Sequence, residues 1–309
     1  MTSDDTSSRA PLPSLAPLAR GGLDRSAAER TQPDLLERLR ADAGTRVLPA
    51  HADRAPLDEA GRLLLVAPHD VAEHARWAFL GRDADGTALL VAATAAEEPA
   101  PVEAERWGAL RAVGGDLPAD QSGAFVEAVS LGRWLVDAPH CAGCGARLED
   151  RQAGWARRCP ACDREHFPRT DPAVIVGVIS SDGERLLLGR NALWAAANMF
   201  STFAGFVEAG ESLETTIVRE VEEEAGVRVA RLEYRGSQAW PYPRSLMLGF
   251  HAHAIDDAEA RADGEEIVEV RWFTREELRA GLRGEADFGL PGAASIAHRL
   301  IVDWVEERP

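Results

Sequence analysis

Three glutamates in one short stretch, Glu220, Glu223 and Glu224, could together hold a divalent cation. The stretch fits a helix that begins after Gly210 and ends at Gly226, since glycine commonly ends helices. Its apolar residues follow a helical period: Leu213, Ile217 and Val221. Glu220 and Glu224 lie four residues apart along the edge of that stripe, with Glu223 one step round the helix. We therefore expect these acids to be drawn toward the protein body.

Acidic side chains crowded on a partly buried face repel each other and resist ionising together. A bound divalent cation removes that penalty, and hard oxygen ligands favour Mg²⁺ or Mn²⁺. The alternative is a solvated acidic helix face, which is what most glutamate runs are. The apolar stripe argues against that alternative, because it leaves Glu222 as the member of the run that points to water.

All four cysteines of the chain lie in two CxxC pairs. Cys141 and Cys144 form the first pair, and after fourteen residues Cys159 and Cys162 form the second. Two such pairs are typical of a zinc ribbon, in which four thiolates hold one tetrahedral Zn²⁺. Two disulfides are the competing interpretation, but they need an oxidising compartment, and a redox CxxC explains two paired motifs less well. Four protein ligands leave no open position, so we expect a structural zinc.

A longer pattern covers residues 205–227, GFVEAGESLETTIVREVEEEAGV. Its fixed positions are Gly205, Glu211, Arg219-Glu220-Val221, Glu223-Glu224 and Gly226-Val227. The stretch resembles the Nudix box at every one of these positions. The resemblance implies metal-dependent hydrolysis of a nucleoside diphosphate linked to another group. It also implies a set of catalytic residues: Glu211, Arg219, Glu220, Glu223 and Glu224.

The segment SQAWPYPRS, residues 237–245, narrows the substrate. It resembles the SQPWPFPxS signature of the NADH pyrophosphatases, with Ala239 in place of the first proline and Tyr242 in place of phenylalanine. Tyrosine keeps an aromatic face and adds a hydroxyl, so stacking survives, whereas alanine loosens one backbone position. A zinc ribbon ahead of the Nudix box and a further domain ahead of the ribbon match the layout of the same family. The resemblance is specific from Cys141 onward and weak before it.

The resemblance implies roles for individual residues. Glu220 and Glu224 would hold the catalytic cations, and Glu266 would add a third carboxylate, because Glu266, Glu269 and Trp272 match the family pattern E-x-x-E-x-x-W. Adjacent Glu265 leaves that register open, and Arg219 would orient the neighbouring glutamates rather than bind phosphate.

Other residues would bind the dinucleotide. Phe167 and Phe206 are placed to stack on the nicotinamide ring, and Arg111 matches weakly a substrate arginine of the N-terminal domain. The remaining residues would line the site: Ala204, Gln238, Ala239, Trp240, Pro241, Tyr242, Pro243, Arg244, Ser245 and Ala297.

The elements that must position these residues suggest a four-part chain. Residues 1–30 are polar and proline-rich and are predicted to be a disordered tail. Residues 31–138 form an N-terminal α/β domain with a hairpin around Asp85-Gly86, residues 139–168 the ribbon, and residues 169–309 the Nudix domain. The predicted fold class is α/β, with the Nudix domain an α/β/α sandwich on a mixed sheet.

Composition limits the partners. The net charge is −17, from 51 acidic and 34 basic residues, which argues against a broad electrostatic hold on nucleic acid or an anionic membrane. No apolar run is long enough to span a bilayer, and the N-terminus lacks the apolar core of a signal peptide, so we expect a cytoplasmic protein. The family resemblance implies a homodimer.

Three functions compete. The leading hypothesis is a pyrophosphatase that converts NADH or NAD⁺ to nicotinamide mononucleotide and AMP and also removes the NAD cap from RNA. The second is a Nudix hydrolase of ADP-ribose or another dinucleotide. The third is a non-catalytic module that binds nucleotide or RNA. The intact Glu220, Glu223 and Glu224 oppose the third, because a site without catalysis has no reason to keep mutually repelling acids.

Overall fold

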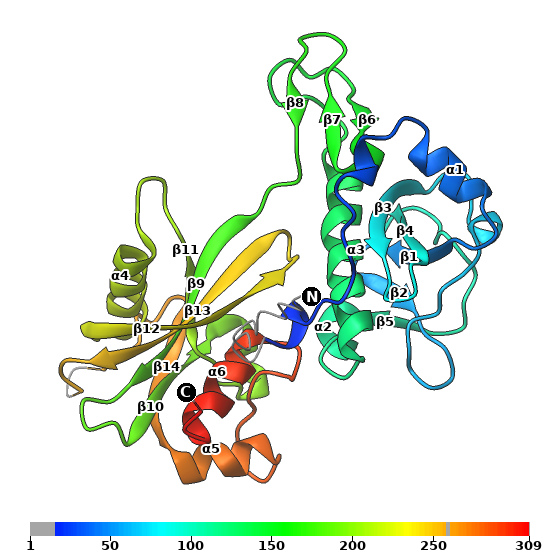
Figure 1. Ribbon diagram of the computed structural model, residues 1–309. Helices are drawn as coiled ribbons and strands as arrows, with labels where there is room; N and C mark the ends of the chain where they lie inside the picture. Colours follow the sequence, from blue (N-terminus) through cyan, green and yellow to red (C-terminus); the bar gives the residue numbers. More distant parts are fainter. Residues whose placement is uncertain (1–15, 258–259, 309) are drawn as a thin grey trace, which may run out of the picture.

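The computed structural model describes residues 16–257 and 260–308, and it folds into three successive regions, each with its own sheet (Figure 1). A five-stranded sheet belongs to the N-terminal region, a three-stranded sheet to the cysteine region and a six-stranded sheet to the C-terminal region. Within these residues, no helix combines the length and the apolar character needed to cross a membrane.

The N-terminal sheet has the strand order β3-β4-β1-β2-β5. Its elements are α1 (Leu35–Ala41), β1 (Arg46–His51), β2 (Arg54–Pro56), β3 (Arg76–Arg82), β4 (Ala88–Thr94), β5 (Trp107–Ala109), α2 (Leu110–Val113) and α3 (Ala119–Asp137). The long helix α3 packs on one face of this sheet and α1 on the other. The expected hairpin is present: β3 and β4 pair antiparallel across the Asp85-Gly86 turn, where Gly86 has a φ of +81°.

Residues 16–30 depart from the expected disordered tail. They contain two 3₁₀ helices, η1 (Pro17–Ala19) and η2 (Glu29–Thr31), and Leu18 is buried against the core of the N-terminal region. The backbone N–H of Leu18 donates to Gln238 Oε1 at 3.1 Å, and Arg20 donates to the carbonyl oxygen of Gly115 at 3.1 Å. A polar, proline-rich segment is therefore held by a few contacts with distant residues. Residues 1–15, the rest of that predicted tail, lie outside the described residues.

The cysteine region stands at the end of α3 (Figure 1). It comprises β6 (Glu149–Arg151), the 3₁₀ helix η4 (Gln152–Gly154), β7 (Ala156–Arg158) and β8 (Glu165–His166). Arg157 is buried and donates to the carbonyl oxygens of Leu135 and Ala138, both at 2.7 Å. A cation at the carbonyl end of a helix is favourable, so Arg157 fixes this region to the C-terminus of α3.

The C-terminal region is an α/β/α sandwich on a mixed sheet, as predicted. Its path is β12-β13-β9-β10-β14, with β11 also paired to β9, and only the β9–β13 pair is parallel. The elements are β9 (Asp171–Ile179), β10 (Arg185–Asn191), β11 (Phe203–Phe206), α4 (Leu213–Ala225), β12 (Val229–Trp240), β13 (Ser245–Ala254), β14 (Ile267–Thr274), α5 (Arg275–Leu282) and α6 (Ile296–Val305).

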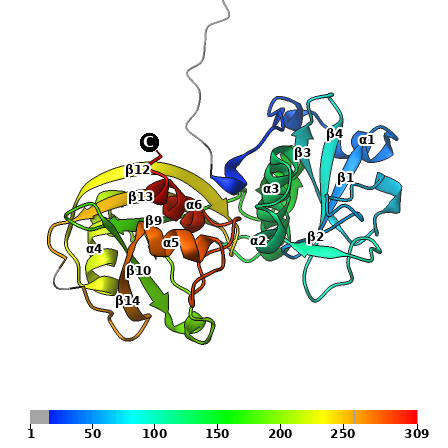
Figure 2. The same ribbon diagram turned by 90° about the horizontal axis from the view of Figure 1, so that it is seen from below.

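Alternation along the central strand β9 explains the two layers. Val174, Val176 and Val178 pack with α4, whereas Ile175 and Ile179 pack with the opposite layer, which contains α5 and α6. Side chains of a strand point alternately to its two faces, so a strand that is apolar throughout must be covered on both. Figure 2 shows the sandwich and the N-terminal region side by side, with the β12–β13 connection directed toward α3.

Candidate active site

Helix α4 carries the glutamate run, and local sequence sets both of its ends. The Ser212 hydroxyl accepts from the backbone N–H of Thr215 at 3.2 Å, and Gly226 ends the helix in the left-handed conformation with a φ of +65°. The predicted stripe packs against the sheet, since Ile217 and Val221 are fully buried and Leu213 is partly buried in the same cluster. This burial turns Glu220 and Glu224 inward and leaves Glu222 exposed.

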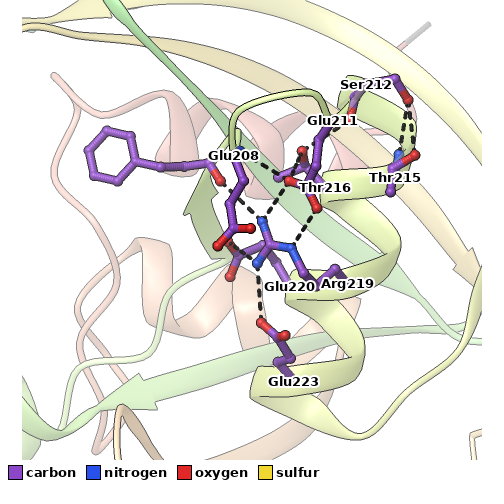
Figure 3. A network of polar contacts seen from close by, with 9 residues as sticks. Glu208, Glu211, Ser212, Thr215, Thr216, Arg219, Glu220 and Glu223 are labelled. Atoms are coloured by element: carbon purple, nitrogen blue, oxygen red, sulfur yellow. Dashed lines mark hydrogen bonds and ion pairs between the residues drawn. The ribbon is translucent and has the colours of Figure 1, made fainter.

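Arg219 is the centre of a hydrogen-bond network on this helix (Figure 3). Its guanidinium binds Glu211 through two bonds of 2.8 and 2.9 Å, and it donates to Glu220 Oε1 at 2.8 Å and to Glu223 Oε2 at 3.1 Å. It also donates to the carbonyl oxygen of Phe206 at 3.2 Å. One planar cation thus fixes three carboxylates and the end of β11. These contacts indicate that Arg219 orients the neighbouring glutamates.

Glu211 is held firmly in its ionised form. The Arg219 guanidinium is the main cause, followed by the backbone N–H of Glu208, and together with the Thr216 hydroxyl they lower the pKa of Glu211 to about 2. Glu211 therefore remains a carboxylate at any pH at which the protein works. Its position at the start of α4 also places a negative charge where the helix dipole favours one.

Glu220 lies directly beneath the strand β11. A side chain at Gly205 would put its Cβ only 1.9 Å from the Glu220 carboxyl group, so this position requires glycine. Burial raises the pKa of Glu220, and Arg219 opposes that rise, whereas Glu223 and Glu266 add to it. The glycine of the box therefore allows a carboxylate to approach the backbone, and we interpret this as its structural purpose.

Glu224 is the most deeply placed acid of the run. It is 5% exposed, and its Oε2 has no hydrogen-bond partner among the described residues. Burial is the main cause that raises the pKa of Glu224 to about 8, with the nearby carboxylates of Glu266, Glu220 and Asp263 adding to the rise and a hydrogen bond from the backbone of Ala204 opposing it. A buried, unpartnered carboxylate oxygen among three other acids is unfavourable unless a cation joins them.

The turn before β14 brings Glu266 to this group. Asp263 Oδ1 accepts from the backbone N–H groups of Glu265 and Ile267, at 2.8 and 2.9 Å, and Glu266 accepts from the side chain of Asn191 at 3.3 Å. Glu266, not Glu265, is the neighbour that perturbs both Glu220 and Glu224. Of the two residues, Glu266 is the one whose charge acts on this pair, and its role as a metal ligand stays a prediction.

The donor chemistry of this group suits a divalent cation, whereas among the described residues only the four cysteines bring three or more ligand atoms within 4.8 Å of one another. The donors are hard carboxylate oxygens from α4 and from the turn before β14, one of them buried without a partner, and β11 supplies close backbone on the other side. Glu220, Glu224 and Glu266 would hold the ion, with Asp263 close enough to contribute charge. Oxygen-only donors are the set that Mg²⁺ and Mn²⁺ prefer.

The four cysteines converge as predicted. Their Sγ atoms all lie within 4.8 Å of one another, with Cys141 to Cys162 at 3.6 Å and Cys144 to Cys159 at 3.4 Å. All four are free thiols, so the disulfide interpretation is not supported. Four thiols at one point form a closed site for zinc, which belongs to the structure of the ribbon rather than to catalysis.

The predicted substrate loop, residues 237–245, lies at the end of the sheet where β9 begins. Ser245 pairs with Asp171 on one side of β9, and Phe206 pairs with Ala173 on the other, so the loop and the end of β11 flank the first residues of β9. Pro243 and Arg244 are exposed there, whereas Ala204, Ala239, Trp240 and Tyr242 are partly buried. The structure thus brings both predicted segments to the same end of the sheet.

Four of the predicted lining residues are in the interior. Gln238 is 1% exposed, and Pro241, Ser245 and Ala297 are also buried. The Gln238 amide is used between protein segments, accepting from Leu18 and donating to the Ala294 carbonyl oxygen at 2.9 Å. The side chain of Gln238 therefore positions the loop from behind and is not offered to a ligand.

The two predicted aromatic residues are accessible. Phe206 and Phe167 both expose their rings, and Phe167 lies in the segment that leads from β8 into β9. Among the described residues their rings make no contact with each other; Phe167 has the Arg169 guanidinium 5.7 Å from its ring centre. Arg111, at the start of α2, contacts the loop, because its backbone N–H donates to the Tyr242 hydroxyl.

Comparison with known proteins gives the same two domains. The NUDIX domain profile matches residues 169–291, and the NADH pyrophosphatase zinc ribbon domain profile matches residues 137–167. The NAD-capped RNA hydrolase NudC of Mycobacterium tuberculosis (strain ATCC 25618 / H37Rv) is 38% identical over 307 residues, covering 95% of this chain and 96% of the relative. This chain belongs to the NudC family of Nudix hydrolases.

Other relatives match a smaller part. NudC of Stutzerimonas stutzeri (strain A1501) is 39% identical over 210 residues, or 68% of this chain and 71% of the relative. NAD-capped RNA hydrolase NUDT12 of Macaca fascicularis is 38% identical over 203 residues, or 62% and 44%. Among solved structures, a NUDIX hydrolase from Nitrosomonas europaea covers 55% of this chain and 91% of its own, with 26% identity and a TM-score of 0.43.

Within this Nudix domain, Asp263 is the acid that the sequence did not reveal. The Asp263-Gly264 pair is a visible turn signal, and Gly264 has a φ of +82°. The signal predicts the turn but not its neighbours, since the approach of Asp263 to Glu224 depends on the pairing of β14 with β10.

Proposed function

We propose that this NudC-family protein hydrolyses the pyrophosphate bond of NADH and NAD⁺, giving nicotinamide mononucleotide and AMP, and removes the NAD cap from RNA. The observation that carries the proposal is the buried Glu224 with its unpartnered oxygen, set among Glu220, Asp263 and Glu266. Relatives that align over nearly the whole chain are named NAD-capped RNA hydrolases, which supports the same chemistry.

The residues have distinct tasks in that reaction. Glu220, Glu224 and Glu266 would bind the divalent cation, which when present neutralises the charge that develops on the pyrophosphate oxygens. Arg219 keeps Glu220 and Glu223 in place through its 2.8 and 3.1 Å bonds, with Glu211 as its own anchor. Glu223 is 61% exposed and lies at the open side of the cluster, where a carboxylate can accept a proton from the attacking water.

We propose Mg²⁺ or Mn²⁺ as the catalytic cation and a structural zinc in the ribbon. The carboxylate set suits either hard cation, whereas the four thiols suit zinc. Removing each metal separately distinguishes them. Mild chelation with EDTA should abolish turnover while the zinc content stays at one per chain, and added Mg²⁺ or Mn²⁺ should restore it.

The nicotinamide end of the substrate is assigned to Phe206 and Phe167, whose rings are accessible at the entrance of the sheet. Stacking on an aromatic ring contributes about 1–3 kcal/mol per base. NADH should therefore exceed ADP-ribose by about ten- to a hundredfold in kcat/KM, since ADP-ribose has the same pyrophosphate without the base. Phe206→Ala should erase most of that preference and leave ADP-ribose hydrolysis nearly unchanged; an equal loss on both substrates would show that Phe206 only packs the loop.

Product analysis tests the proposal. Purified protein is incubated with Mg²⁺ or Mn²⁺ and with NADH, NAD⁺, ADP-ribose or NAD-capped RNA, and the products are separated by chromatography. Release of mononucleotide and AMP, or of 5′-monophosphate RNA, supports it. A preference for ADP-ribose would leave the Nudix chemistry but remove the NADH assignment, and no turnover with any metal would favour a binding module.

A cytoplasmic homodimer remains part of the proposal. The dimer rests on the family resemblance of residues 205–227 and 237–245, and the location is the expectation from the sequence. Light scattering after size-exclusion chromatography tests the dimer directly, with one 33.3 kDa chain as the alternative.

A further inference from the structure

The side-chain hydroxyl of Tyr242 joins the substrate loop to the N-terminal domain. It donates to Asp53 Oδ2 at 3.0 Å and accepts from the backbone N–H of Arg111 at 3.1 Å. Asp53 follows β1 and Arg111 lies at the start of α2, so both partners belong to a different domain from the loop. A loop signature with phenylalanine at this position, which the segment resembles, has no atom that could make either bond.

The same contact holds the Arg111 side chain. Its guanidinium carbon lies 4.9 Å from the centre of the Tyr242 ring, and its Nη2 lies 3.7 Å from Asp53 Oδ2. Its side chain is nevertheless 65% exposed. Because one carboxylate is shared between the Tyr242 hydroxyl and this guanidinium, Asp53 sets the position of Arg111 while only partly compensating its charge.

The hydroxyl is a permanent donor in this setting. Burial, with Asp53 next, raises the pKa of Tyr242 to about 12. The bond to Asp53 is therefore present throughout the pH range in which the enzyme can act. Further contacts hold the loop, since Arg133 on α3 donates to the Pro241 carbonyl oxygen at 2.9 Å and the side chain of Gln238 accepts from the backbone N–H of Leu18.

We propose that Tyr242 and Asp53 are positioning residues that hold Arg111 at the substrate loop, where it supplies a cation to the phosphates of the dinucleotide. This inference rests on the proposed function and deepens it. The pyrophosphate approaches a cluster of four acids in which Arg219 pairs with Glu220, so an exposed cation at the edge of the loop offsets repulsion from the other carboxylates. The N-terminal domain thereby contributes to binding without entering the metal site.

Steady-state kinetics with NADH test this coupling. Tyr242→Phe removes only the hydroxyl, and we expect KM to rise about tenfold, or about 1.4 kcal/mol, with kcat changed by less than about twofold. Arg111→Ala should raise KM by about the same factor. The double variant should also lie near tenfold instead of the hundredfold of independent effects, because the hydroxyl acts through Arg111.

Tyr234→Phe is the matched control. It removes the hydroxyl of the only other tyrosine, which is exposed on β12 and packs edge-on against Phe250 at 5.4 Å. Its KM should equal that of the wild type. A purely structural role for Tyr242 would lower the melting temperature and leave KM unchanged, and that result, or additive KM effects, would overturn the proposal.

A binding measurement separates this inference from the proposed function. In a Glu224→Gln background, which should not turn over substrate, fluorescence titration gives the Kd for NADH. Tyr242→Phe should raise that Kd about tenfold, and Asp53→Asn, which keeps an acceptor for the hydroxyl, should raise it less. A wild-type protein that binds NADH without hydrolysing it would remove the proposed function alone. An unchanged Kd in Tyr242→Phe would remove this inference alone, and absence of NADH binding would remove both.

Discussion

Two buried glutamates, one in each large domain, differ only in what surrounds them. Glu127 on α3 and Glu224 on α4 are both 5% exposed, and each has one carboxylate oxygen without a hydrogen-bond partner among the described residues. In both, burial is the main cause of a raised pKa, to about 7 for Glu127 and about 8 for Glu224. Burial alone therefore does not tell a structural carboxylate from a functional one.

The charges nearby make the distinction. Arg25 lies 3.3 Å from Glu127, and Arg25 and Arg30 both act to lower its pKa. Around Glu224 the neighbours are Glu266, Glu220 and Asp263, which all raise it. Glu127 already has its counter-charge within the protein, whereas Glu224 is set among acids, which is the arrangement expected of a cation ligand. A buried carboxylate surrounded by other carboxylates is therefore a better indicator of a functional site than burial alone.

The largest expected effect is that of removing the ribbon zinc, because the ribbon contacts the cations around Glu127. Trp155 of the ribbon has the guanidinium of Arg30 at 3.8 Å and that of Arg25 at 5.6 Å from its ring centre, so the cations around Glu127 depend on the ribbon. Cys159→Ser should abolish zinc binding, which contributes on the order of 10 kcal/mol in small zinc peptides, and lower the melting temperature strongly. Ala161→Ser, between the same ligands, should change neither; elemental analysis without zinc in the wild type would contradict the assignment.

On the Glu224 side, Glu224→Gln should remove activity and keep the fold. The change is nearly isosteric and relieves repulsion among the acids, so the melting temperature should hold or rise slightly. The rate should fall by about a thousandfold, or about 4 kcal/mol, since a metal ligand on the transition-state side is lost. Glu127→Gln and Glu222→Gln should retain wild-type kcat. A Glu224→Gln protein with a tenth of the wild-type rate at saturating metal would identify another carboxylate as the ligand.

The pH dependence of the unfolding free energy tests the role of Glu127. Its folded pKa of about 7 lies above the ordinary glutamate value, so its contribution to stability is fully present below about pH 4.5 and is lost as the pH rises through 7. The loss should amount to about 3 kcal/mol of unfolding free energy. Glu127→Gln should flatten this part of the stability profile measured by denaturant unfolding, whereas Glu222→Gln should preserve it. A profile that keeps its slope in Glu127→Gln would assign the dependence to another group.

Local sequence was sufficient for the glutamate helix. Its apolar period, its Ser212 start and its Gly226 end are all adjacent residues, so the orientation of Glu220 and Glu224 follows from spacing alone. The cysteine cluster is equally local, with 22 residues from Cys141 to Cys162. The fold class follows from the same periodicities together with the family resemblance.

Contacts between distant segments could not be predicted. Gln238 was expected to line the substrate site, but its partners Leu18 and Ala294 are 220 and 56 residues away, and no pattern near Gln238 indicates that it is buried. The same holds for Leu18, one apolar residue in a segment whose composition predicts disorder. The burial of such residues becomes visible only once the distant segments of the folded chain are placed together.

The smallest expected effect is a direct test of which glutamate needs a cation. A ligand that binds only the folded protein raises its stability by RT ln(1 + [L]/Kd), about 1.4 kcal/mol at ten times Kd. Added Mn²⁺ or Mg²⁺ should therefore raise the melting temperature by about 3–6 °C, given a domain of this size. Glu127→Gln should keep the shift, because its carboxylate is compensated by Arg25, and Glu224→Gln should lose most of it. Thermal melts of the wild type and the two variants, with and without metal, measure this shift. An equal shift in both variants would mean that the cation binds elsewhere. The two buried glutamates would then differ in their neighbouring charges but not in metal binding.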